Sequence, residues 1–198
     1  MRTRGGFNLE INYILPAILI LIAAFIVYTY NRLIGLRNTA DTAYANIDTL
    51  LQKRFDLVPN LVNTVKGYMK HERKLLEEIT KARTDWMKAS TIQENAGADD
   101  IATKALKTLF AVSENYPDLK ANQNFMMLQE ELVGLENKIA YARQRYNRTI
   151  LILNMVIQKV PSNLVAQLFK FKTREFFEVE SDQVRSVPNV DIQGGDNQ

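Results

Sequence analysis

The chain has 198 residues, a formal net charge of +3 at pH 7 and no cysteine. Charges of both signs are interspersed, and no segment gathers basic residues on one face as a nucleic-acid-binding surface requires. The absence of cysteine excludes disulfides and a cysteine nucleophile. Glycine and proline are scarce, with 8 and 5 residues, which favours long helices over an all-β fold.

An uncharged apolar run extends from Ile11 to Tyr30. Twenty residues of helix rise roughly 30 Å, which matches the hydrocarbon core of a bilayer. The run is too long for a signal peptide, has no cleavage site at its end, and lacks the polar face of a core helix. We therefore expect one uncleaved membrane-spanning helix, marked by Ile11, Tyr13, Leu15, Ile20, Phe25, Tyr28 and Tyr30.

The basic residues on the two flanks of the span are almost equal in number. Arg2, Arg4 and the α-amino group precede it, against Glu10, whereas Arg32 and Arg37 follow it. Because the positive-inside rule compares Lys and Arg near the two ends, this small difference favours a cytoplasmic head and an exported domain. The expected division is a head over 1–10, the span over 11–30, a helical bundle over 31–187 and a disordered tail over 188–198.

Apolar residues recur every three or four positions from Leu33 to Leu51, which is helical periodicity. The span is therefore predicted to continue outward as one helix. Pro59 disfavours helical angles in the residue before it, so we expect a kink or break near residues 57–58, with Asp56 capping the restart. Further apolar stripes follow over residues 58–69 and 75–86.

Residues 88–99 are polar, contain Gly97 and are predicted to form a loop. A short helix is expected over 100–115, followed by a turn at 116–118. The buried face of that helix is predicted to carry Ile101, Ala105, Leu109 and Val112.

The longest regular pattern is a heptad seam from Phe125 to Val160, ended by Pro161. Ser162 is predicted to cap a short helix through Leu168. The arm over residues 32–86 is the only partner long enough to cover the seam. The predicted fold is all-α, with one N-terminal transmembrane helix continuing into a long antiparallel helical bundle.

We predict no catalytic, cofactor-binding or metal-binding residues and no nucleic-acid partner. His71 and Glu72 begin a metalloprotease-like pattern, but residue 75 is leucine, so the second zinc-binding histidine is missing. No phosphate-binding glycine loop or serine elbow is present. Neighbouring acids at 77–78 and 130–131 point to different faces of a helix, which is unsuited to an acid/base pair.

Asparagine and arginine residues supply the other polar candidates. The asparagines are predicted to make helix-to-helix hydrogen bonds that fix the bundle register, and the alternative is a polar ligand site inside the bundle. This set is Asn60, Asn63, Asn147 and Asn154. Arg143, Arg145 and Arg148 are interpreted as a solvated face.

Aromatic and basic residues alternate after Leu168. They are candidates for contact with an anionic membrane surface, although the aromatic rings are better interpreted as closing the open end of the bundle core. The membrane candidates are Phe169, Lys170, Phe171, Lys172 and Arg174, and the aromatic residues of the stretch continue with Phe176 and Phe177.

One segment resembles the hallmark segment of the LemA family: Arg54-Phe55-Asp56-Leu57-Val58-Pro59-Asn60-Leu61-Val62. The resemblance extends from the apolar run to the region of Pro188. It implies a bacterial single-pass protein of the inner membrane with a helical bundle domain and no established enzymatic activity. A relative is implicated in forming the magnetosome membrane. Val160 departs from the family, which usually has phenylalanine before this proline.

These features favour a non-enzymatic scaffold anchored in the membrane. Its expected partners are the lipid bilayer, further copies of itself in a homo-oligomer, and other envelope proteins. Two alternatives are an oligomer that remodels membrane and a cryptic enzyme or ligand-binding module built on the bundle asparagines.

Overall fold

The computed structural model describes the backbone of residues 4–178 and the side chains of residues 13–178. This part contains helices and no strand, which confirms the all-α prediction. The predicted tail over 188–198 lies outside it. The helices are α1 (Arg4–Val65), α2 (Arg73–Lys88), α3 (Ile92–Ser113), α4 (Pro117–Lys120), α5 (Gln123–Gln158) and α6 (Ser162–Leu168).

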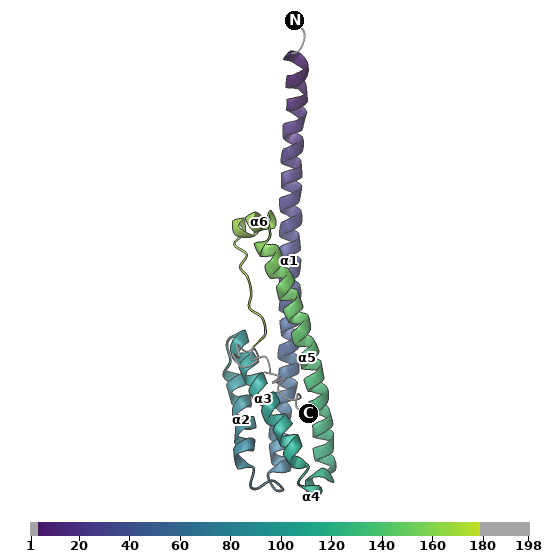
Figure 1. Cartoon of the computed structure of the whole chain (residues 1–198), viewed down its shortest axis with the longest axis vertical. Coiled ribbons are helices and arrows are strands. Elements are labelled where there is room, and N and C mark those ends of the chain that lie inside the picture. The colour runs from purple at the N-terminus through teal and green to yellow at the C-terminus, as the bar shows by residue number, and fades with distance from the viewer. Residues whose placement is uncertain (1–3, 179–198) are drawn as a thin grey trace, which may run out of the picture.

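Helix α1 is the longest element, with 62 residues and a length of roughly 90 Å. Its N-terminal half stands clear of the other helices, and its C-terminal half is packed into the bundle (Figure 1). The free half is long and apolar enough to cross a membrane. Of the predicted span residues, Tyr30 is half-buried, the side chain of Ile11 lies outside the described residues, and the rest are exposed.

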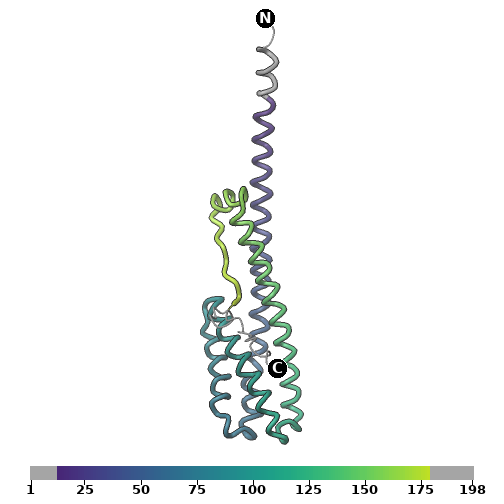
Figure 2. Tube along the Cα trace, viewed as in Figure 1, coloured from purple at the N-terminus to yellow at the C-terminus, as the bar shows by residue number. Residues whose placement is uncertain are grey.

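The bundle is antiparallel, as predicted (Figures 1 and 2). Helices α1 and α3 run away from the free end of α1, and α2 and α5 run back toward it. Four helices surround the core at the base. Nearer the free end, α5 alone continues beside α1 to α6. After a turn at residues 169–170 the chain returns toward the base in an extended conformation over residues 171–178.

The heptad seam of α5 is buried along most of its predicted length. Leu132, Ile139 and Tyr146 belong to one apolar cluster with residues of α1. Val160 is the exception, with 79% of its surface exposed, because α5 ends at Gln158 before the seam reaches it. Ser162 does not cap α6 as predicted. Its hydroxyl donates instead to the carbonyls of Val156 and Lys159, at 2.6 and 2.9 Å.

The predicted break before Pro59 is wrong, because α1 continues unbroken to Val65. Pro59 has no N–H to offer the carbonyl of Phe55, four residues earlier. Arg83 of α2 supplies the missing donor, with its Nε 3.0 Å from that oxygen. The Phe55 ring also stacks on Trp86, with 5.0 Å between centroids. Asp56 is therefore an exposed mid-helix residue and not a cap.

The predicted loop over 88–99 is also wrong, since α3 begins at Ile92. Thr91 and Glu94 form a capping box at its start: the Glu94 N–H donates to the Thr91 hydroxyl, and the Thr91 N–H donates to the Glu94 carboxylate. The buried face of α3 contains Ala105 and Leu109 as predicted, but Ile101 is exposed. The turn precedes the predicted residues 116–118, at 114–115, and α4 already begins at Pro117.

Arg83 and Pro59 provide a test of the repaired hydrogen bond. Arg83→Ala removes a charged donor to a backbone carbonyl, so we expect it to lower the free energy of unfolding by about 1.5–3 kcal/mol. In a Pro59→Ala background residue 59 regains its N–H, and the same change should cost clearly less. Denaturant unfolding of the full chain in detergent micelles measures both. An equal cost in the two backgrounds would contradict this role of Arg83.

Candidate functional site

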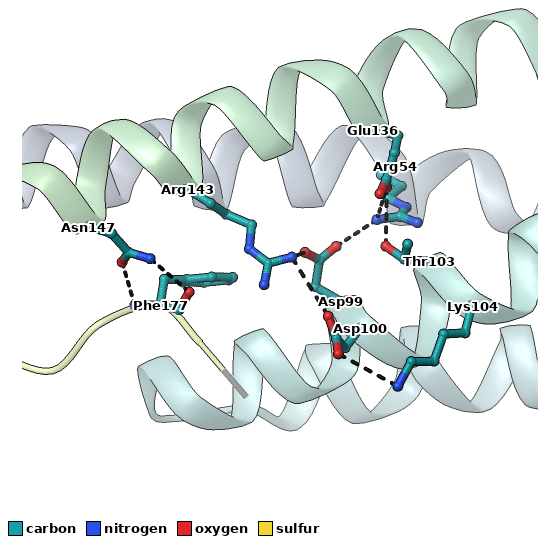
Figure 3. A network of polar contacts seen from close by, with 9 residues as sticks. All are labelled: Arg54, Asp99, Asp100, Thr103, Lys104, Glu136, Arg143, Asn147 and Phe177. Carbon is teal, nitrogen blue, oxygen red and sulfur yellow. Dashed lines mark hydrogen bonds and ion pairs between the residues drawn. The ribbon is translucent and has the colours of Figure 1, made fainter. Parts of the chain in front are cut away.

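A cluster of charged side chains lies inside the bundle and joins three helices (Figure 3). Arg54 of α1 is only 1% exposed. Its Nη1 lies 2.6 Å from Oδ1 of Asp99 in α3 and 3.0 Å from Oε2 of Glu136 in α5. Because a charge this deeply buried must be paired, Arg54 ties α1 to both other helices.

Arg143 of α5 extends the cluster. Its Nη1 lies 3.3 Å from Oδ2 of Asp99 and 3.8 Å from Oδ1 of Asp100. The guanidinium also lies over the Phe177 ring, at 5.2 Å from its centroid. The prediction of a solvated face is therefore wrong for Arg143, which is half-buried, whereas Arg145 and Arg148 are exposed.

The electrostatics of the cluster are dominated by burial. Removal from water raises the pKa of Asp99 to about 6, while the guanidinium groups of Arg54 and Arg143 act in the opposite direction. Asp99 is thus ionised at neutral pH. Asp99 and Arg54 are both shielded from solvent. We therefore interpret the cluster as a set of buried ion pairs that selects the helix register, and not as a site for a substrate.

Asn147 and Asn154 bind the extended C-terminal segment and not another helix. The side-chain amide of Asn154 bonds both the N–H and the carbonyl of Arg174, at 2.9 and 2.8 Å. Asn147 holds Phe177 in the same way, at 2.8 and 3.3 Å. Because these amides are occupied by backbone groups, the alternative of a ligand site at these two asparagines is not supported.

The spacing of the two asparagines matches the segment they hold. Asn154 lies seven positions after Asn147 on the helix, a rise of roughly 10.5 Å. Phe177 lies three positions after Arg174 in the extended segment, a rise of roughly 10 Å. Between these contacts the Tyr146 hydroxyl donates to the Glu175 carbonyl at 3.1 Å. The asparagines therefore do set a register, but it is that of the segment against α5.

The prediction for Asn60 and Asn63 is wrong, because both side chains are exposed on α1. Asn63 accepts a hydrogen bond from the nearby Lys66 at 3.0 Å, so it fixes no contact between helices. His71 is also exposed. Among the described side chains, no three His, Asp or Glu residues are grouped so that they could hold a metal ion.

A groove of about 380 Å³ lies where the free part of α1 meets the bundle. Its lining combines aromatic and basic side chains of α1 and of the segment after α6. The Tyr30 ring packs against Phe169 and Phe171, with centroid distances of 4.6 and 6.0 Å. The lining residues are Tyr30, Ile34, Arg37, Leu153, Phe169, Lys170, Phe171, Lys172, Thr173 and Arg174.

The predicted aromatic and basic set is thus divided between two environments. Phe171 packs on the small apolar cluster of Leu33 and Leu153, and Arg174 forms an ion pair with Asp41. The rest of the set is exposed: Phe169, Lys170 and Lys172. Of the aromatic rings expected to close the core, Phe177 belongs to the main core cluster.

The raised pKa of Asp99 predicts a pH-dependent stability. Its usual pKa is 3.8, so the folded protein binds this proton more tightly than the unfolded chain does. The stability gained is complete below about pH 4 and is lost as the pH rises through about 6. Relative to Asp99→Asn, wild-type stability should fall by up to about 3 kcal/mol over this interval.

Urea unfolding at a series of pH values measures this difference, with Asp118→Asn as the control at an exposed carboxylate. If the wild type instead became more stable relative to Asp99→Asn as the pH rises, the two arginines would outweigh burial and the prediction would be wrong.

Comparison with known proteins places these features in a family. The model of the LemA family matches residues 43–192. Magnetosome protein MamQ 2 of Paramagnetospirillum magneticum is 24% identical over 181 residues, which cover 78% of this chain and 66% of that protein. Magnetosome protein MamQ of Magnetospirillum gryphiswaldense is 24% identical over 174 residues, covering 75% and 64%.

Protein LemA of Metamycoplasma hominis is 26% identical over 167 residues, covering 82% of this chain and 72% of that protein. The chain therefore spans about two thirds of the length of its magnetosome relatives. The family model covers most of the bundle, including Arg54, Asp99, Glu136 and both segment-binding asparagines. The chain is thus a helical, membrane-associated member of the LemA family.

Proposed function

We propose that this protein is a non-enzymatic scaffold anchored in a membrane, whose bundle binds further copies of itself side by side. The observation that carries the proposal is the continuity of α1 from the apolar run to Val65. A continuous helix transmits the orientation of the anchor to the bundle, which then stands off the bilayer as a rod. Such a rod presents its long faces to neighbours in the same membrane.

The outward face of α5 supports the choice of a second copy as partner. Large apolar side chains are exposed along it, at positions that fall within an arc of roughly 80° on a helix. They are Met126, Val133, Tyr141, Leu151 and Met155. The same arc also carries exposed polar residues: Glu130, Asn137, Gln144 and Arg148. A face that mixes apolar and polar side chains has the composition of a protein–protein contact surface. The face runs parallel to the rod, so two copies held upright can meet along it.

Anchoring lowers the affinity that such a contact needs. Copies confined to one membrane have a high effective concentration, so individually weak lateral contacts suffice for assembly. At the centre of the charge cluster Arg54 and Asp99 are buried and paired with each other, which supports a structural role for these charges over catalysis. Relatives that are named as magnetosome proteins support the same class of role.

We also propose that the membrane is the bacterial inner membrane and that the bundle lies on its exported side. Arg2 and Arg4 in the short head support this orientation through the positive-inside rule. Because the chain has no cysteine, Asn124→Cys in the first turn of α5, exposed and outside the proposed contact face, gives a single reporter. An impermeant maleimide should label it in spheroplasts with an intact inner membrane. Labelling only after lysis would show that the bundle lies on the cytoplasmic side and would contradict the proposed orientation.

Self-association is tested by placing charge on the outward face of α5. Val133→Glu together with Tyr141→Glu should weaken the homo-oligomer at least about tenfold, since each substitution removes an apolar contact and desolvates a charge. Native mass spectrometry of the full chain released from lipid nanodiscs measures the oligomer. Thr108→Glu on the exposed face of α3 is the control. A strictly monomeric wild type, or an unchanged oligomer in the double variant, would contradict the proposal.

A further inference from the structure

We infer that α6 and the groove beside it form a second contact with the membrane, in which the groove holds the phosphate headgroup of an anionic phospholipid. The inference rests on the proposed anchor, because the bilayer must surround the free part of α1. Apart from Tyr30 at the end of the span, it concerns residues that neither the anchor nor the α5 face uses.

The position of α6 brings it to the membrane boundary. Tyr30, at the end of the uncharged run, packs against Phe169 directly after α6. One turn further on, Leu33 forms an apolar cluster with Ala166 of α6 and Val156 of α5. In Figures 1 and 2, α6 lies across the end of the bundle beside α1. A bilayer that encloses the uncharged run therefore has its surface at α6.

The side chains of α6 and its approach suit that surface. Leu164 and Leu168 lie one helical turn apart and are exposed, as is Val160 before them. The end of α5 and α6, bent by 92°, together reach the apolar character of a membrane-spanning segment. Apolar side chains on a short element at this depth insert into the interface between headgroups and acyl chains. The neighbouring span fixes lipid as the occupant.

The groove supplies the charge for a headgroup. Arg37, Lys170 and Lys172 line it together with the Tyr30 ring. Among the described side chains, no carboxylate lies within ion-pairing distance of these three cations, whereas Arg174 in the same lining is paired with Asp41. Cations at the edge of the hydrocarbon attract anionic lipid, and each strengthens binding roughly fivefold.

The backbone conformation of Lys170 gives independent support for a role of its charge in the groove. It follows α6 with a φ of 57°, a left-handed conformation that favours glycine. The Lys170 N–H donates to the Gln167 carbonyl and the Phe171 N–H to the Ala166 carbonyl, at 3.1 and 2.8 Å, which is the Schellman arrangement that usually has glycine at this position. A lysine there is unfavourable for the backbone, so its charge requires another reason.

The principal test uses the full chain in nanodiscs of equal parts phosphatidylcholine and phosphatidylglycerol. Native mass spectrometry should detect phosphatidylglycerol retained by the wild type. The triple variant Arg37→Gln, Lys170→Gln and Lys172→Gln should lose at least about tenfold of that retention. A matched triple variant of exposed lysines, Lys74→Gln, Lys107→Gln and Lys138→Gln, should retain it. Equal retention in all three proteins would overturn the inference.

Two further arms separate the alternatives. Lys170→Gly should leave the melting temperature unchanged or raised while it weakens retention of phosphatidylglycerol. A purely structural lysine would give unchanged retention and would overturn its assigned role. Soluble glycerol phosphate, added as a competitor, should displace little lipid. Full displacement would mean that the groove takes free phosphate and not a lipid headgroup.

Depth in the membrane is measured with a bimane label on single cysteines in bilayers of brominated phosphatidylcholine. Quenching at both Leu164→Cys and Phe25→Cys, and none at Asn124→Cys, supports the second membrane contact. Quenching at Phe25→Cys alone leaves the anchor intact and overturns the α6 contact. Absence of quenching at Phe25→Cys would overturn the proposed anchor and this inference together.

Discussion

Helix α1 lies in two environments, lipid along its first part and the packed bundle along its second, and the rest of the structure depends on keeping it unbroken between them. Over residues 13–28 α1 is apolar on every side, as a helix in lipid must be, and from Leu33 onward it buries only one face. A break at Pro59 would separate the base of the bundle from the anchor. Arg83 prevents this by taking the place of the missing N–H at the Phe55 carbonyl, so α2 is part of what keeps α1 straight.

The apolar seam between α1 and α5 does not by itself define one alignment. A heptad pattern repeats every seven residues, and a slip of one heptad would leave many apolar contacts in place. Such a slip would move Arg54 by roughly 10 Å relative to Glu136 and leave buried charges unpaired, which costs several kcal/mol. The ion pairs of Arg54 with Asp99 and Glu136 therefore discriminate between alignments of the helices, whatever their net contribution to stability.

The sequence predicts the features that depend on residues close to one another. Length and the absence of charge are enough to predict the membrane-spanning run, and the heptad period is enough to predict the buried seam of α5. Local signals were also present for two features that were missed: Thr91 and Glu94 have the spacing of a capping box, and Arg54 occupies a seam position between Leu51 and Val58. A polar residue at such a position indicates a buried, paired charge, but the period does not reveal its partner.

Other features depend on pairs that are distant in the chain. Nothing near Asn147 indicates that its amide binds Phe177, because an extended segment has no periodicity of its own to detect. Pro59 is a similar case. Local rules describe the N–H that proline lacks, but only the fold brings the Arg83 side chain to the Phe55 carbonyl in its place. Asn60 and Asn63 resemble Asn147 and Asn154 by residue type alone. Their exposed positions on α1 separate them, and that depends on which face α5 covers.

The two proposed contacts have a joint geometric consequence. A single span fixes the position of a rod in the membrane but leaves it free to turn about its own axis. A second contact through α6, on one side of α1, would restrict that rotation. The outward face of α5 would then point in a fixed direction in the membrane plane. Lateral assembly through that face would need to overcome less orientational freedom, because the bilayer has already removed part of it. The membrane contact would thus favour self-association without adding any area to the interface between copies.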